Sequence, residues 1–277
     1  MRVQSLASLL LASLASLAAP SLLAAGACEK LVATAAPEQP PYLWRDAGQP
    51  KRLGGASADM AAEIGKRLGV KIEILDSGTA SQALADVQSG RVDLLLGSVL
   101  DMARLENLDF VHPPMLDLPS VIWLRKDAGF SYLGWNDLRG RKGVRLKGAE
   151  AGAQFEAFAR ANLTFSTVDS PRQALERLQQ GKADYLLLER QAGAAAAASL
   201  GLGESLQVYE APVFSEQRYL ALSHGSACNE PKLRGQLARI MTELQASGLP
   251  ARLIESNLQR WQAEQAGATT TLQENTP

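Results

Sequence analysis

The sequence predicts an α/β fold made of two similar lobes, each a mostly parallel sheet flanked by helices, with a cleft between them. The first reason is an internal repeat: Ser81–Leu96 and Arg172–Leu187 align without a gap, 91 residues apart, with Gly90 matching Gly181. The second is the alternation of strand-like and helix-like segments in each half. The third is that the chain returns to the first lobe after the second, so that two crossing segments form a hinge.

In the first lobe, a Pro-rich loop separates the opening strand from the first predicted helix. Pro37–Asp46 is this loop, and the helix follows from apolar residues at helical spacing that end at Gly69, a common helix stop. In order, we predict strand, helix, strand, helix and strand at Leu31–Ala36, Ser57–Leu68, Lys71–Leu75, Ser81–Gln88 and Val92–Leu96. This alternation favours parallel strands covered by helices.

The second lobe repeats the alternation between two extended segments that cross the hinge near Leu118–Ile122 and Ala211–Tyr219. Ser170 and Pro171 begin one of its helices, because Ser is a favoured N-cap and Pro fits the first turn. The other elements are predicted at Pro119–Lys126, Gly143–Lys147, Ala151–Asn162, Thr164–Val168, Asp184–Leu188 and Gln191–Leu200, then at Leu206–Val213, Arg218–Ser223, Lys232–Ala246 and Pro250–Trp261.

These elements divide the chain into four predicted parts. Residues 1–27 form an export signal, and residues 28–118 with 219–262 form the first lobe. Residues 119–218 form the second lobe with the hinge segments. We expect residues 263–277 to be a disordered tail, because this segment lacks apolar periodicity.

The first residues predict a signal peptide that is removed on export. Arg2 supplies a positive start, Leu6–Leu23 is rich in Leu and Ala, and Ala25-Gly26-Ala27 is a small-residue cleavage site. One alternative is a retained membrane anchor, which the interrupting serines disfavour. Another is a lipid attached to Cys28, which Ala25 disfavours because Leu is usual at that place. We therefore expect a periplasmic protein, cleaved near Ala27.

Two cysteines and a near-neutral charge limit the possible functions. In an exported chain Cys28 and Cys228 predict a disulfide, with two free thiols as the alternative. A formal net charge of −1 without a basic run excludes nucleic acid as an expected partner. His112 and His224 stand alone, so we expect neither a metal nor another cofactor.

Candidate ligand residues follow the strands of the repeat, because ligands of open α/β sheets lie beyond the carboxyl ends of the strands. Gly97 and Ser98 follow the strand of the first copy, and Glu189 is the equivalent of Ser98 in the second. Arg104, seven residues after Gly97, suits a carboxylate, and Glu189 suits an amine. The alternatives are a surface ion pair for Arg104 and a solvated strand end for Glu189.

Three further positions complete the predicted pocket. Tyr42 and Trp44 offer apolar and cation-π surface, with loop packing as the alternative. Gly148 precedes a helix whose backbone amides can bind an anion, although Glu150 would oppose one.

The segment Gly97–Pro113 resembles the signature of bacterial family 3 extracellular solute-binding proteins, which serve ABC importers of polar amino acids. Gly97 and Arg104 have its spacing, and Asp109-Phe110 precede Pro113. The resemblance covers roughly residues 31–261, and further matching stretches are Pro40–Trp44, Gly55–Asp59 and Gly90–Asp93. It implies the two-lobed type II periplasmic-binding fold and no catalytic residues. It also implies a small polar ligand, amino-acid-like or bearing a carboxylate or amine, and an ABC-importer permease as partner; we expect a monomer.

Family roles carry over unevenly. The resemblance implies that Arg104 binds the ligand carboxylate, that Glu189 binds its amine and that Tyr42 is an aromatic pocket residue. Val99 stands where the family has Thr or Ser, and Gly148-Ala149 stand for the usual Gly-Thr or Gly-Ser, so hydroxyl donors are missing from both lobes. These departures argue against a standard α-amino acid as ligand.

Two alternative functions stay open. One is an enzyme resembling the cyclohexadienyl and arogenate dehydratases, with Glu189 or Glu150 as general acid. The other is a ligand-sensing partner of a membrane receptor.

Overall fold

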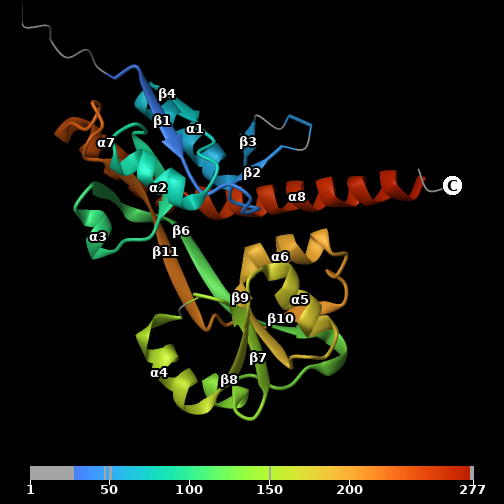
Figure 1. Cartoon of the computed structure of the whole chain (residues 1–277). Helices are drawn as coiled ribbons and strands as arrows, with labels where there is room; N and C mark the ends of the chain where they lie inside the picture. Colours follow the sequence, from blue (N-terminus) through green and yellow to red (C-terminus); the bar gives the residue numbers. More distant parts are fainter. Residues whose placement is uncertain (1–27, 47, 50–51, 150, 275–277) are drawn as a thin grey trace, which may run out of the picture.

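The structure, a computed structural model, describes residues 28–46, 48–49, 52–149 and 151–274, with side chains through residue 267 (Figure 1). The predicted export signal and Glu150 therefore lie outside the described residues. None of the helices in the described part of the chain combines the length and apolar character needed to cross a membrane.

Two lobes lie one above the other in Figure 1, joined by two long strands. The joining strands are β6 (Leu108–Arg125) and β11 (Phe214–Ser223). The first lobe contains β1 (Lys30–Thr34), β2 (Trp44–Arg45), β3 (Leu53–Gly54), α1 (Ala56–Leu68), β4 (Lys71–Ile74), α2 (Ala80–Gln88), β5 (Leu94–Ser98), α3 (Met102–Leu105), α7 (Pro231–Ala246) and α8 (Leu249–Glu274). The second contains β7 (Lys142–Leu146), α4 (Gly152–Asn162), β8 (Thr164–Val168), α5 (Pro171–Gln179), β9 (Tyr185–Glu189), α6 (Arg190–Ser199) and β10 (Leu206–Val208).

One continuous sheet runs through both lobes in the order β4-β1-β5-β11-β6-β9-β7-β8, with β10 on β6. Each lobe carries the same parallel unit, β4-β1-β5 in the first and β8-β7-β9 in the second. The joining strands are antiparallel to these units, and Ser120 on β6 pairs with both Phe214 and Glu189. The predicted α/β fold with two parallel-sheet lobes is therefore confirmed.

The internal repeat has the same structural meaning in both lobes. Thr79 and Ser170 cap α2 and α5, each accepting a hydrogen bond from the backbone N–H of the Gln three residues later. Gly90 and Gly181 then take positive φ values of 77° and 67°, where glycine is favoured. The repeated aspartates each accept a hydrogen bond from the strand beside them, Asp93 from Val32 N at 2.8 Å and Asp184 from Lys142 N at 2.6 Å.

The buried apolar residues gather separately in the two lobes. Met60 and Ile64 on α1 pack with strand residues and α7 in the first lobe. Phe155 on α4 and Tyr185 on β9 belong to a cluster of the second. The lobe boundaries predicted at residues 118/119 and 218/219 fall inside the two joining strands, and this division stays a prediction.

The predicted tail requires a correction, because α8 continues to Glu274. Ala263-Glu264-Gln265-Ala266 are good helix formers, and Gly267 alone interrupts them weakly. The Glu264 carboxylate also accepts a hydrogen bond from Trp44 Nε1 at 3.1 Å, which ties this part of the helix to the first lobe. Apolar periodicity alone did not reveal either feature.

The predicted disulfide is confirmed. Cys28 and Cys228 are bonded with a Cα–Cα distance of 5.7 Å and a sequence separation of 200 residues. The bond joins the start of β1 to the segment that leads into α7.

Candidate functional site

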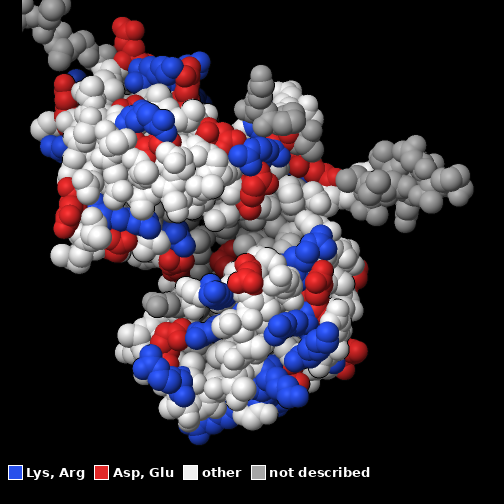
Figure 2. Space-filling view, in the orientation of Figure 1, with Lys and Arg blue, Asp and Glu red and all other residues white. Residues whose placement is uncertain are grey.

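A cavity of about 780 Å³ lies between the lobes and is lined from both. Figure 2 shows the groove between them, with acidic and basic side chains at its rim. β5 and β9 end at this cavity, as expected for ligand sites at the carboxyl ends of parallel strands. Of the predicted pocket residues, Tyr42, Gly97, Ser98, Arg104 and Glu189 line it.

Arg104 is held in place by its neighbours in the first lobe. Asp101 caps α3 and forms an ion pair with Arg104 Nε at 3.0 Å. Arg104 Nη1 donates to Ser98 Oγ at 3.1 Å and to the Val99 carbonyl oxygen at 3.4 Å. Gly97 has a φ of 80°, which favours glycine where the strand turns toward this loop. The guanidinium reaches the cavity with its orientation already set by protein contacts.

Ser98 and Val99 both accept hydrogen bonds from the Arg104 guanidinium, which the sequence did not predict. Ser98 is buried, and its hydroxyl donates to the Val99 carbonyl oxygen at 3.1 Å while accepting from Arg104. Val99 is not among the residues that line the cavity. Both residues therefore orient the guanidinium, and a direct contact of either with a ligand stays a prediction.

Glu189 lies across the cavity at the junction of β9 and α6. Its Oε1 accepts from Gln191 N at 2.9 Å and its Oε2 from Ala192 N at 2.6 Å, so the carboxylate caps α6. Burial raises the pKa of Glu189 above its ordinary value, against the opposing effect of these two backbone hydrogen bonds. The alternative interpretation, that Glu189 is a solvated strand end, is therefore wrong, because both of its oxygens bind backbone N–H groups.

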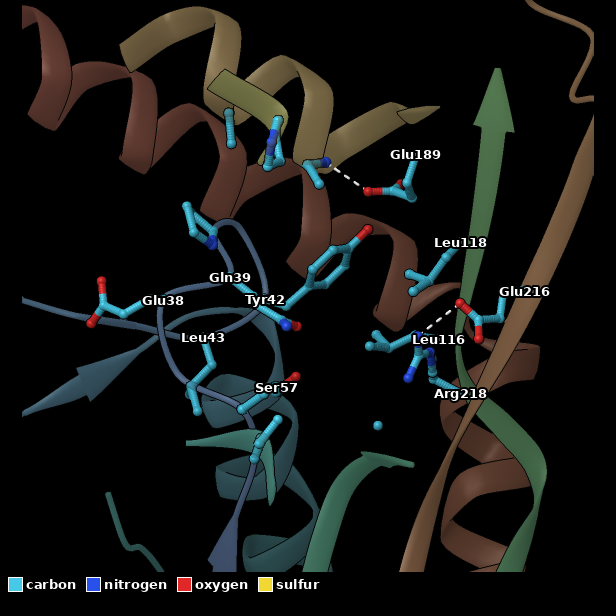
Figure 3. Close-up of a pocket in the computed structure, with 18 of the residues that line it drawn as sticks. Glu38, Gln39, Tyr42, Leu43, Ser57, Leu116, Leu118, Glu189, Glu216 and Arg218 are labelled. Carbon is cyan, nitrogen blue, oxygen red and sulfur yellow. Dashed lines mark hydrogen bonds and ion pairs between the residues drawn. The ribbon is translucent and has the colours of Figure 1, made fainter. Parts of the chain in front are cut away.

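Tyr42 is buried, and its hydroxyl points toward Glu189 (Figure 3). Burial and the negative charge of Glu189 raise the Tyr42 pKa well above its ordinary value. The hydroxyl forms no hydrogen bond of good geometry with the described residues, and Glu189 is the acidic side chain beside it. A buried polar atom without a partner is costly, which makes this hydroxyl a ready donor to a bound ligand.

Trp44 and Gly148 do not line the cavity. Trp44 is 2% exposed, and Arg260 stacks on its ring with 4.7 Å between the guanidinium carbon and the ring centroid. Its predicted role as a pocket wall is therefore wrong. Trp44 has the alternative role of a packing residue, because α8 covers its ring. Gly148 lies in a turn after β7 with a φ of 74°.

Arg218 and Trp261 are among the cavity residues that the sequence analysis did not predict. Arg218 on β11 lies at the cavity, where its Nη2 donates to Glu216 Oε2 at 2.7 Å (Figure 3). Its buried Nε has no hydrogen-bond partner among the described residues. The spacing of Glu216 and Arg218 on one strand face was a usable signal. Trp261 on α8 also lines the cavity, and only the position of α8 reveals this.

The described residues contain no group of three or more His, Cys, Asp or Glu side chains placed to hold a metal ion. The arrangement can bind an anionic group at Arg104 and donate a hydrogen bond from Tyr42. The Glu189 carboxyl, whose pKa burial raises, holds its proton to a higher pH than a solvated carboxyl does.

Comparison with protein families gives a match to the bacterial extracellular solute-binding proteins, family 3, over residues 31–260. The chain belongs to this family. It is therefore an extracellular solute-binding protein of bacterial type. A comparison with curated proteins found no match.

Solved structures share the fold at low sequence identity. The arginine-bound amino acid ABC transporter substrate-binding protein AbpA from Streptococcus pneumoniae is 21% identical, with 84% of this chain and 96% of that chain covered and a TM-score of 0.58. The open second substrate-binding domain of Lactococcus lactis GlnP is 20% identical, covers 83% and 96%, and has a TM-score of 0.68. A histidine kinase sensor domain is 22% identical, covers 84% and 95%, and has a TM-score of 0.57. At these identities the likeness shows the type II periplasmic-binding fold with two lobes.

Proposed function

We propose that this solute-binding protein captures a small carboxylate in the interlobe cleft, with Arg104 as the carboxylate-binding residue. The observation that carries this proposal is the fixed guanidinium of Arg104 at the cavity, oriented by Asp101, Ser98 and the Val99 carbonyl. A planar guanidinium suits a carboxylate, and fixing it in advance lowers the entropic cost of binding. Closure about β6 and β11 would bring Glu189 and Tyr42 to the same ligand.

The ligand would then pass to the permease of an ABC importer, with the protein acting as a monomer in the periplasm. The disulfide supports export, because such bonds persist in oxidising compartments. Cleavage near Ala27 would leave Cys28 at the start of the mature chain, free to pair with Cys228.

Arg104→Ala tests this proposal through calorimetric titration of the mature, oxidised protein with carboxylates. We expect a loss of binding of at least about tenfold, because a charge-assisted hydrogen bond contributes roughly 1.5–3 kcal/mol. Arg239→Ala is the control, since Arg239 pairs with Glu243 on the exposed face of α7 and is not a cavity residue. Equal affinity of both variants and the wild type would reject the role of Arg104.

A second candidate function is acid catalysis at Glu189, as in a dehydratase. The favouring observation is that Glu189 is half-buried at the cavity with a raised pKa, and a general acid must hold its proton near working pH. Incubation with prephenate separates the two functions. Turnover that Glu189→Gln abolishes would establish the enzyme, and binding without turnover would exclude it for this substrate.

A further inference from the structure

One wall of the cleft is formed by small and apolar side chains. α6 turns Ala192, Ala195, Ala196 and Ser199 toward the cavity, at the spacing of a single helix face. Trp261 on α8 also lines the cavity. We call these five residues the α6–α8 wall.

α8 carries the Trp261 ring to this wall from the first lobe. Trp261 Nε1 donates to the Ala195 carbonyl oxygen of α6 at 3.0 Å, and its ring meets Trp44 edge-on with 5.5 Å between centroids. Asn257 fixes the same helix to the first lobe by donating to Asp59 Oδ2 at 2.7 Å. In Figure 1, α8 passes along α6 at the junction of the lobes. The indole is therefore held at the cleft by contacts on both sides.

The carboxylates of the cleft already have partners within the protein. Glu216 accepts from Arg218 at 2.7 Å, and Glu38 accepts from Arg45 at 2.6 Å. Both oxygens of Glu189 accept backbone N–H groups of α6, and burial raises its pKa. A cationic ligand group would have to displace or share one of these partners, whereas an apolar group would meet the α6–α8 wall without competition.

We propose that the α6–α8 wall is an apolar subsite, and that the ligand is a carboxylate bearing an aromatic or branched aliphatic group. This inference rests on the proposed function, because Arg104 supplies the site for the carboxylate. Each CH₂ group that becomes buried raises affinity by about fourfold. Affinity should therefore rise with the size of the apolar group until the subsite is filled.

Calorimetric titration of the mature, oxidised protein tests this with acetate, butanoate, 4-methylpentanoate, 3-phenylpropanoate and L-arginine. We expect affinity to rise on the order of 100-fold from acetate to 4-methylpentanoate, because four more carbon atoms are buried. We also expect 3-phenylpropanoate to bind more tightly than L-arginine.

Variants of the α6–α8 wall test whether the preference for apolar ligands arises there. Ala196→Asp places a charge in the subsite and should weaken 3-phenylpropanoate by at least about tenfold, because the charge must be desolvated. Ala198→Asp on the same helix is the matched control, since Ala198 is not a cavity residue. Trp261→Phe keeps an aromatic wall without the hydrogen bond to Ala195 and should keep most of the apolar preference.

The outcomes separate this inference from the proposed function. Affinity that does not rise with apolar size, or tighter binding of L-arginine than of 3-phenylpropanoate, overturns the subsite. Equal effects of Ala196→Asp and Ala198→Asp overturn its location. Binding that Arg104→Ala leaves unchanged overturns the proposed function instead, and no binding of the whole panel counts against both.

Discussion

Trp44→Ala should strongly destabilise the ligand-free protein, because Trp44 joins α8 to the rest of the first lobe. Its ring is 2% exposed, and its Nε1 donates to Glu264 at 3.1 Å. Replacing a fully buried Trp by Ala costs about 3–5 kcal/mol, and the lost stacking of Arg260 adds up to about 1 kcal/mol. Since domains are stable by about 5–15 kcal/mol, the change is a large fraction of the total.

Urea unfolding of the mature, oxidised protein without ligand measures this cost. Trp44→Phe is the control, because it keeps most of the ring volume and loses mainly the hydrogen bond, worth about 1 kcal/mol. Trypsin cleavage after Arg260 gives an independent readout, since α8 should open more often in Trp44→Ala. A loss below about 1 kcal/mol for Trp44→Ala, with α8 equally protected, would refute the role of Trp44 as an anchor.

Three further predictions concern the disulfide, the repeat and Glu189. Replacing Cys28 and Cys228 by Ser should lower the free energy of unfolding by about 5 kcal/mol in the chain-entropy model, and urea unfolding that matches the oxidised wild type would contradict this. Asp93→Ala should lower the free energy of unfolding by about 1–3 kcal/mol, and by more than Asp184→Ala does. The reason is that the hydrogen bond to Asp93 is part-buried, whereas the hydrogen bond to Asp184 is exposed. Equal urea midpoints for the two variants would contradict this. For Glu189 the raised pKa means that the native state keeps a proton that the unfolded chain has released. The free energy of unfolding of the wild type relative to Glu189→Gln should therefore fall as pH rises from about 4.3 through the raised pKa, and a flat difference in urea titrations would refute it.

The fold could be predicted because the repeat encodes local contacts that recur in each lobe. The capping hydroxyls of Thr79 and Ser170 act within their own helices. Asp93 and Asp184 bind strands that lie far away in the sequence, but they do so in the same way in both lobes. Local rules therefore place the helices and strands to within a few residues. The long strand β6 was seen only in its last part, because the prolines at its centre hid its beginning.

The site was less predictable, because its geometry depends on contacts between segments far apart in the chain. Glu189 was found from the repeat and Arg104 from its spacing after Gly97, and both line the cleft. Trp44, which was expected at the pocket, is buried, whereas Trp261, for which no site role was expected, lines the cavity. Nothing local distinguishes them, because the position of α8 decides which indole faces the cleft.

Most charged side chains of this cleft form hydrogen bonds or ion pairs within the protein. These contacts restrict which residues can change when ligand specificity changes. Ser98 and Asp101 hold Arg104, and Glu189 caps α6, so the charged ends of the site are fixed by the fold itself. Changing any of them would disturb a helix terminus or an ion pair as well as the ligand. Ala192 and Ala196 of the α6–α8 wall form no side-chain hydrogen bond or ion pair, because their side chains are small and apolar and line the cavity. Under the proposed function, selection among carboxylates can therefore change at this wall while the joining strands and the proposed carboxylate site stay the same.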